Sequence, residues 1–139
     1  MSDPAMRPDP IERIDSAFFW AACERGEFVA QKCAGCGKLW HPPRPICPVC
    51  YSTEKTEQKL SGRGVVMSWA KQVRPASFGF AESPIVVLVE LEEGLRFVAT
   101  LEDVDEDSVA AGLNVTVDFA KTSGGKTAPV FRPAGGTNG

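Results

Sequence analysis

The chain has 139 residues, of which 43% are hydrophobic and 24% charged. This length suits one domain, or one domain with a small module, and folding would bury roughly two thirds of the surface that the unfolded chain exposes. The composition excludes a wholly disordered protein, and the 13 glycines and 11 prolines favour short strands and turns over long helices.

The net charge of -3 is unevenly distributed along the chain. Five acids fall within residues 102–107, whereas residues 58–81 carry four basic residues and no acid. Part of the surface therefore suits an anion, with Arg63, Lys71 and Arg74 as the candidate contacts. A solvated basic face is the alternative interpretation of the same stretch.

The compartment can be predicted from what the sequence lacks. No apolar run approaches the eighteen or so residues of a membrane helix, and residues 1–10 have no signal-peptide core. We expect a cytoplasmic protein with no membrane partner. Thiols stay reduced there, so clustered cysteines indicate metal ligands or redox groups rather than disulfides.

The N-terminal third begins with residues 1–14, which we expect to be flexible because prolines interrupt them without any periodicity. Residues 15–26 predict a short helix, which Asp15 would cap and Gly26 would end. The alternation in residues 27–32 then predicts a strand that leads directly into the first cysteine pair.

Four of the five cysteines form two C-x-x-C pairs separated by ten residues, namely Cys33 with Cys36 and Cys47 with Cys50. Each pair lets two thiolates converge, and two pairs complete a tetrahedral metal shell. Zinc is the expected metal and iron in a rubredoxin-like site the alternative. Disulfides and a thioredoxin-type redox centre fit the pattern less well. Because protein fills all four positions, the metal would be structural.

The remaining candidates for chemistry are few. Cys23 lies outside the pattern and is expected to be a small buried hydrophobe. His41 is the only histidine, and we expect a structural or exposed side chain rather than a ligand. No nucleophile motif, plausible pair of carboxylates or phosphate-binding glycine loop is present, so catalysis by the chain alone is not expected.

Beyond the cysteines, five segments rich in Val, Ile, Phe and Thr predict short strands. They are GVVMSWAKQV, PIVVLVEL, LRFVATL, NVTVDFAK and PVFRP, with a helical turn near DSVAAG. This count matches the five-stranded OB-fold barrel, and a small open sandwich is the alternative. Trp69 is expected in the barrel core.

The predicted protein is thus mainly β, with an N-terminal helix and a rubredoxin-like zinc ribbon followed by a five-stranded OB-fold barrel. Its expected boundaries are a flexible N-terminus over 1–14, helix and ribbon over 15–56, the barrel over 57–133 and a flexible tail over 134–139.

This combination resembles the family of acyl-CoA-associated OB-fold proteins with an N-terminal rubredoxin-like zinc ribbon. The likeness covers residues 15–133. It is carried by the aromatic helix AFFWAACERGEF, the module QKCAGCGKLWHPPRPICPVC and the barrel segments SGRGVVMSWAKQVRP and PIVVLVELEEGLRFVATLEDV. The ligands that match the family's motif are the four paired cysteines.

The resemblance implies a non-catalytic subunit of a thiolase-like enzyme, such as an aldolase, thiolase or acyltransferase, in a hetero-oligomer. The enzyme would act on acyl-CoA thioesters, including those of steroid or fatty-acid side-chain degradation, with acyl-CoA at or near the shared interface. The CoA phosphates would meet the basic residues named above. The expected partner-facing residues are aromatic: Phe18, Phe19, Trp20, Phe78 and Phe80.

Within the aromatic helix, three consecutive rings are more than one buried face can use. We expect Phe18 to face outward; the alternative is that all three rings pack within the chain. Single-stranded nucleic-acid binding is the competing function, because OB-folds and zinc ribbons both bind nucleic acids. A sequence pI of about 5.2 argues against it. An independent acyl-CoA enzyme is a third hypothesis.

Overall fold

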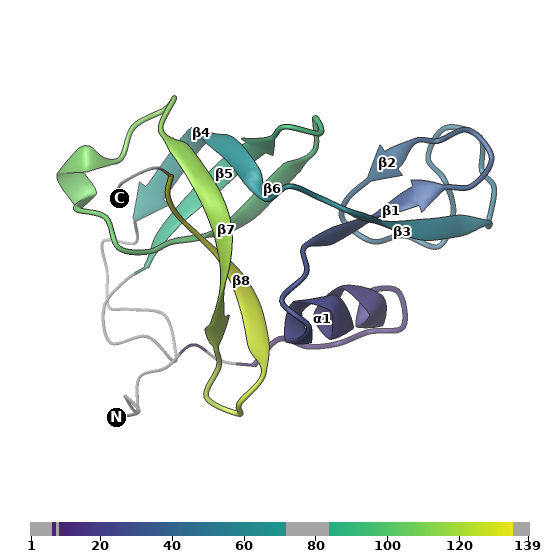
Figure 1. The fold of residues 1–139 in the computed structure, drawn as a ribbon, viewed down its shortest axis with the longest axis horizontal. Helices are drawn as coiled ribbons and strands as arrows, with labels where there is room; N and C mark the ends of the chain where they lie inside the picture. The colour runs from purple at the N-terminus through teal and green to yellow at the C-terminus, as the bar shows by residue number, and fades with distance from the viewer. Residues whose placement is uncertain (1–6, 8, 72–83, 135–139) are drawn as a thin grey trace.

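The computed structural model describes residues 7, 9–71 and 84–134. The chain forms a small three-stranded sheet and a closed five-stranded barrel, with a helix beside the connection between them (Figure 1). The elements in chain order are α1 (Ala17–Glu24), β1 (Val29–Cys33), β2 (Leu39–Trp40), β3 (Lys55–Lys59), β4 (Arg63–Lys71), β5 (Ile85–Leu91), β6 (Arg96–Leu101), the 3-10 turn η1 (Glu106–Ser108), β7 (Asn114–Lys121) and β8 (Thr127–Pro133). The predicted mainly β architecture is confirmed.

The barrel strands follow the order β4-β5-β6-β8-β7, and β7 pairs with β4 to close the sheet. All these pairs are antiparallel except β6 with β8, which are parallel where Leu101 meets Phe131. The turn η1 lies between β6 and β7 in the sequence, which are the third and fourth barrel strands in chain order. This is the five-stranded barrel that the sequence predicts, and its closure excludes the open sandwich.

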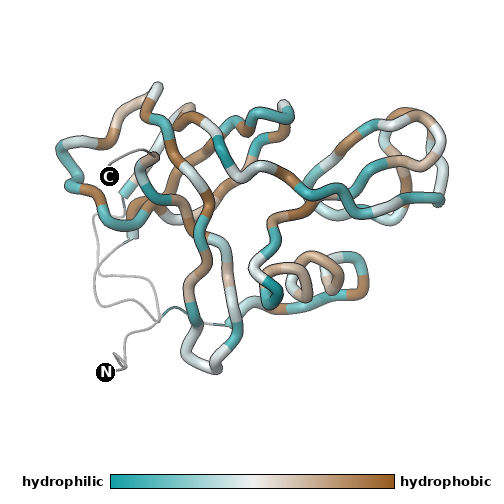
Figure 2. Tube along the Cα trace, viewed as in Figure 1, coloured by the Kyte–Doolittle hydropathy of each residue, from teal (hydrophilic) through white to brown (hydrophobic). Residues whose placement is uncertain are grey.

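Strand β5 illustrates how the sequence builds the barrel core. Ile85, Val87, Val89 and Leu91 are buried, and they alternate with more exposed residues. Because successive side chains of a strand point to opposite faces, this pattern places one row inside the barrel. Figure 2 shows the resulting mixture of hydrophobic and hydrophilic residues along the barrel strands.

The predicted start of helix α1 differs from the observed one, whereas the predicted end agrees. Ser16, not Asp15, is the N-cap residue, and its carbonyl oxygen accepts hydrogen bonds from the N–H groups of Phe19 and Trp20. Gly26 ends the helix as predicted, with a φ of 76° that glycine adopts easily. No helix among the described residues has the length and apolar character of a membrane span.

The main hydrophobic core joins α1 to the barrel. Phe19 and Phe28 belong to the same buried cluster as Phe97 of β6 and Phe131 of β8. The ring centroids of Phe28 and Phe97 are 4.9 Å apart. The ribbon has only a small separate cluster, formed by Cys33, Trp40 and Cys47. The helix is therefore part of the barrel's core, although the ribbon follows it directly in sequence.

The described part of the N-terminal segment is attached to the barrel. Arg7 forms an ion pair with Glu102 at 2.6 Å. Asp9 accepts hydrogen bonds from the Thr122 hydroxyl and, at 2.8 Å, from the N–H of Gly124. These bonds, the first being the stronger cause, hold the pKa of the Asp9 carboxyl below its usual value. The start of the chain thereby reaches the β7–β8 hairpin.

Candidate metal centre and binding surfaces

The four predicted ligands converge at one end of the ribbon. Their Sγ atoms all lie within 4.8 Å of one another, with Cys33 and Cys50 3.5 Å apart and Cys36 and Cys47 3.7 Å apart. Zinc–sulfur bonds of about 2.3 Å in a tetrahedron place sulfurs about 3.8 Å apart. The residues therefore fit a four-coordinate metal, and none of the five cysteines forms a disulfide.

Backbone N–H groups fix one sulfur in each pair. The N–H groups of Gly35 and Cys36 donate to Cys33 Sγ at 3.3 and 3.4 Å. The groups two and three residues after Cys47 donate to its sulfur at the same distances. The bond from Cys36 is the main reason why the pKa of Cys33 is lowered to about 6, against the effect of burial. Burial also acts to raise the pKa of Cys47, but the N–H donors lower it overall.

Cys50 behaves differently from those two thiols. A hydrogen bond from the N–H of Ser52 acts to lower its pKa, but the Cys33 thiol and burial together raise it to about 11. One thiolate thus disfavours a second beside it. A divalent cation among the sulfurs removes this conflict, because its charge favours deprotonation of every ligand.

Gln31 supports the site and was not singled out by the sequence. The side chain is 4% exposed, and its Oε1 accepts a hydrogen bond from the N–H of Arg44 at 2.8 Å. Lys55 Nζ donates to the carbonyl of Pro45 at 3.0 Å. Both bonds hold the loop between the cysteine pairs against the sheet. A glutamine inside an alternating strand was the only sequence signal for this role.

Cys23 and His41 both lie in apolar surroundings. Cys23 is 1% exposed, as predicted, and burial raises the pKa of its thiol to about 12. The His41 ring stacks on Phe97 with centroids 4.3 Å apart. Burial lowers the pKa of His41 to about 4, so the imidazole is neutral at pH 7. No hydrogen bond among the described residues joins it to a Ser, Thr or Cys side chain, so no histidine-activated nucleophile is present there.

The predicted phosphate contacts do not come together. Arg63 and Lys71 are the first and last residues of β4, about 26 Å apart at the usual rise of a strand. Arg63 forms two hydrogen bonds with Glu92 at 2.7 and 2.9 Å, and Lys71 pairs with Glu106 at 3.1 Å. Each cation already has a carboxylate partner. Arg74 lies outside the described residues.

The predicted partner-facing aromatics are less exposed than expected. Phe19 is 3% exposed and belongs to the chain's own core. Phe18 and Trp20 are half-buried and pack against that core, so neither ring is fully exposed. A partner-facing role for Phe18 stays a prediction. Phe78 and Phe80 lie outside the described residues.

Exposed apolar side chains occur elsewhere. On the second cysteine turn, Val49 is 60% and Tyr51 71% exposed. On the barrel, Val98 is 59% exposed. Trp69 is 38% exposed, so the prediction that it lies in the barrel core is wrong. Trp69 pairs with Val87 near the end of β4, beyond the residues of β4 that pair with β7. Such apolar side chains are the usual material of protein interfaces.

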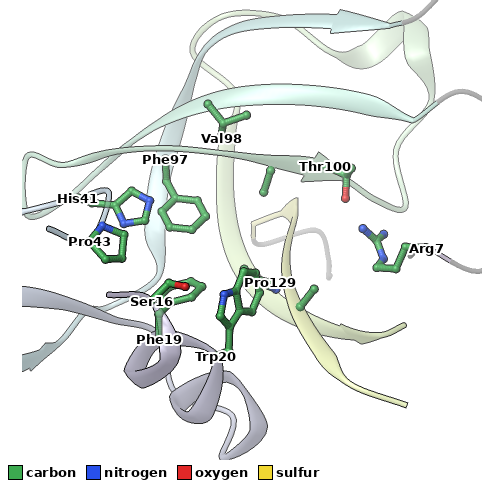
Figure 3. Close-up of a pocket in the computed structure, with 12 residues that line it drawn as sticks. Arg7, Ser16, Phe19, Trp20, His41, Pro43, Phe97, Val98, Thr100 and Pro129 are labelled. Carbon is green, nitrogen blue, oxygen red and sulfur yellow. The ribbon is translucent and has the colours of Figure 1, made fainter. Parts of the chain in front are cut away.

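A pocket of about 340 Å³ lies where helix, ribbon and barrel meet, and we call it the junction pocket. Phe19 and Trp20 of α1 line it on one side, and Phe97 and Thr100 of β6 line it on another (Figure 3). His41, from the loop after β2, completes an aromatic wall beside Phe97. The sequence could not indicate this pocket, because its residues come from five separate segments of the chain.

Two family models cover this architecture. The ChsH2 rubredoxin-like zinc ribbon domain matches residues 20–56, and the ChsH2 C-terminal OB-fold domain matches residues 57–120. The chain belongs to the ChsH2 (DUF35) family. The solved structure of the Ltp2-ChsH2(DUF35) aldolase contains a chain with 36% sequence identity and a TM-score of 0.86, and the match covers 91% of this chain and 99% of that one.

Two longer bacterial relatives are also similar. A probable enoyl-CoA hydratase alpha subunit of Thermomonospora curvata is 38% identical over 130 residues, which is 94% of this chain. The 3-oxo-4,17-pregnadiene-20-carboxyl-CoA hydratase alpha subunit of Mycobacterium tuberculosis is 34% identical over 117 residues, or 84% of this chain. The matched regions span only 41% and 37% of those relatives.

Proposed function

We propose that this chain is a non-catalytic subunit of a thiolase-like aldolase that acts on acyl-CoA thioesters. In this proposal it docks the catalytic subunit through the ribbon and α1 and helps to shape the acyl-CoA site. The acyl group belongs to a steroid or fatty-acid side chain, and the assembly is a hetero-oligomer.

The observation that carries the proposal is the match over nearly the whole chain to a chain of the Ltp2-ChsH2(DUF35) aldolase. The names of the two longer relatives add CoA thioesters, one of them a steroid derivative. The neutral, stacked His41 supports a non-catalytic role, because it is the only histidine and activates no nucleophile among the described residues.

We further propose that the metal is zinc and that its role is structural. The described site supplies four thiolates and leaves no position for water or substrate. A bound zinc would cross-link the two cysteine turns, and the N–H groups described above would orient the sulfurs toward it. Iron in the same shell is the alternative that elemental analysis distinguishes.

The docking proposal can be tested by affinity purification of the tagged chain from its native cell, followed by mass spectrometry. We expect a thiolase-like protein at near-equal stoichiometry. Tyr51→Asp should sharply reduce its recovery, because a charge replaces an exposed ring on the ribbon without touching the core. Phe18→Asp tests α1, and its melting transition is compared with that of wild type because Phe18 also packs against the core. Ala111→Asp on the barrel is the matched control.

Metal content and the melting transition of each variant report folding. Full recovery of the partner by both Tyr51→Asp and Phe18→Asp would exclude docking through ribbon and helix. Titration of single-stranded DNA at low and high salt addresses the competing function. A micromolar, salt-sensitive affinity would favour nucleic-acid binding.

A further inference from the structure

The junction pocket has the properties of a small ligand site. Its volume of about 340 Å³ lies near the lower end of the range for ligand pockets, roughly 300–1,000 Å³. Its walls are mainly aromatic and aliphatic, and they come from α1, β6, β8 and the loop after β2. Because these elements belong to both the ribbon and the barrel, the pocket exists only when these two parts of the chain are packed together.

Two polar groups in the pocket wall have no hydrogen-bond partner among the described residues. The Trp20 indole N–H and the imidazole of His41 make no hydrogen bond with any described residue, although both residues line the pocket. Both residues are half-buried and line the pocket. A neutral imidazole offers one donor and one acceptor, and the indole offers a second donor. The wall can therefore bind an oxygen acceptor.

The charges at the pocket cancel each other. Arg7 is the one cationic side chain among the described residues that line it, and this side chain is only 14% exposed and paired with Glu102 at 2.6 Å. Thr100 donates to the same carboxylate at 3.1 Å. The burial that keeps His41 neutral removes the other source of positive charge. An anionic group would enter without a counter-ion, which disfavours carboxylates.

We propose that the junction pocket binds an uncharged, ring-containing hydrocarbon group that carries a ketone or thioester oxygen, with the oxygen accepting a hydrogen bond from the imidazole of His41. The four aromatic rings contact the hydrocarbon. Resting on the proposed function, we assign this group to the acyl part of the partner enzyme's substrate or product. The chain thereby contributes acyl-group specificity.

The test uses the isolated full chain with its metal bound and 2-decalone, a two-ring ketone, as the probe. Binding is followed by the indole N–H resonance of Trp20 in NMR spectra of the chain labelled with nitrogen-15. We expect a saturable shift of the Trp20 resonance, with Trp40 and Trp69 unaffected. The carboxylate of the same ring system, decahydronaphthalene-2-carboxylate, should bind at least about tenfold more weakly.

Two variants locate the site. Ala128→Leu adds bulk to the pocket wall and should abolish the shift. His41→Phe keeps a ring against Phe97 but removes the polar nitrogens, so it should weaken the ketone about three- to tenfold while leaving decalin, the hydrocarbon without oxygen, unchanged. Trp69→Phe, outside the pocket, is the control and should bind 2-decalone normally.

The proposal is overturned if 2-decalone produces no saturable shift of the wild-type Trp20 resonance, or if the carboxylate binds as tightly as the ketone. Unaltered ketone binding by His41→Phe likewise overturns the assigned hydrogen bond, even if Ala128→Leu fails to fold. These outcomes are independent of the proposed function, whose failure appears instead as absence of the aldolase partner in affinity purification.

Discussion

The molecule has two lobes, the ribbon and the barrel with helix α1, and they are stabilised by different means. The barrel shares one hydrophobic cluster with α1, which includes Phe97 and Phe131. The ribbon buries only Cys33, Trp40 and Cys47 as a separate cluster, and two of these three residues are metal ligands. A cluster of that size cannot offset the conformational entropy of the ribbon. We therefore infer that metal binding determines the stability of the ribbon and that apolar burial determines the stability of the barrel.

The two lobes meet at few places, and His41 is one of them. It leaves the ribbon after β2 and stacks on Phe97 of the barrel. The helix α1 lies on the barrel side of this contact, because Phe19 and Cys23 belong to the barrel's cluster. Removing the metal should therefore disturb the ribbon and the His41 contact while leaving α1 and the barrel folded.

The largest effect is expected from Cys36→Ser, which removes one metal ligand. Structural zinc contributes about 10–16 kcal/mol to the folding of comparable modules. We expect the metal content to fall from about one equivalent to nearly none. In hydrogen exchange, β1 and β3 should lose protection while the barrel strands keep theirs. Cys23→Ala is the control and should retain the metal. Loss of protection throughout the barrel would show that the lobes are not separable.

The converse change is Phe131→Ala in the barrel. Phe131 is fully buried, and removing such a ring costs about 3–5 kcal/mol of folding free energy. We expect a lower denaturation midpoint for the barrel, measured by urea titration, with the metal still bound. Release of the metal at the barrel's own transition would contradict the comparison.

A smaller difference is expected between two glycines, one in each lobe. A Cβ at Gly64 of the barrel would lie 2.5 Å from the carbonyl oxygen of Glu90, whereas at Gly35 of the ribbon its nearest neighbour is Cys33 Sγ at 3.7 Å. Gly64→Ala should therefore cost up to about 3 kcal/mol of stability, and Gly35→Ala should be nearly neutral. Thermal melting of both variants measures this, and equal transitions would exclude the close approach of β4 and β5.

The smallest effect concerns pH at the contact between the lobes. The pKa of His41 is about 4 in the folded chain and near 6.5 when unperturbed, so the unfolded state binds more protons between these values. Stability should fall by about 1–2 kcal/mol from pH 7 to pH 5 through this group. Urea titrations of wild type and His41→Phe at constant metal content measure it. A variant with the same pH slope would show that His41 is not the titrating group.

Much of the fold and of the candidate metal site could be predicted from the sequence, because local patterns of residues determine them. The cysteine spacing located the candidate metal ligands, and the alternation in segments such as β5 predicted the barrel strands. The exposure of Phe18 and Trp69 could not be predicted, since it depends on how α1 meets the barrel and where β4 ends. The burial of Gln31 depends likewise on a loop thirteen residues away.

Reconstitution of the proposed aldolase from separately purified subunits tests most directly whether this chain is a non-catalytic subunit. Cleavage of the CoA-thioester substrate is measured for this chain alone, for the thiolase-like partner alone and for their mixture. We expect no turnover by this chain alone and a large gain in the mixture over the partner alone. Turnover by this chain without any partner, or a mixture no more active than the partner, would contradict it.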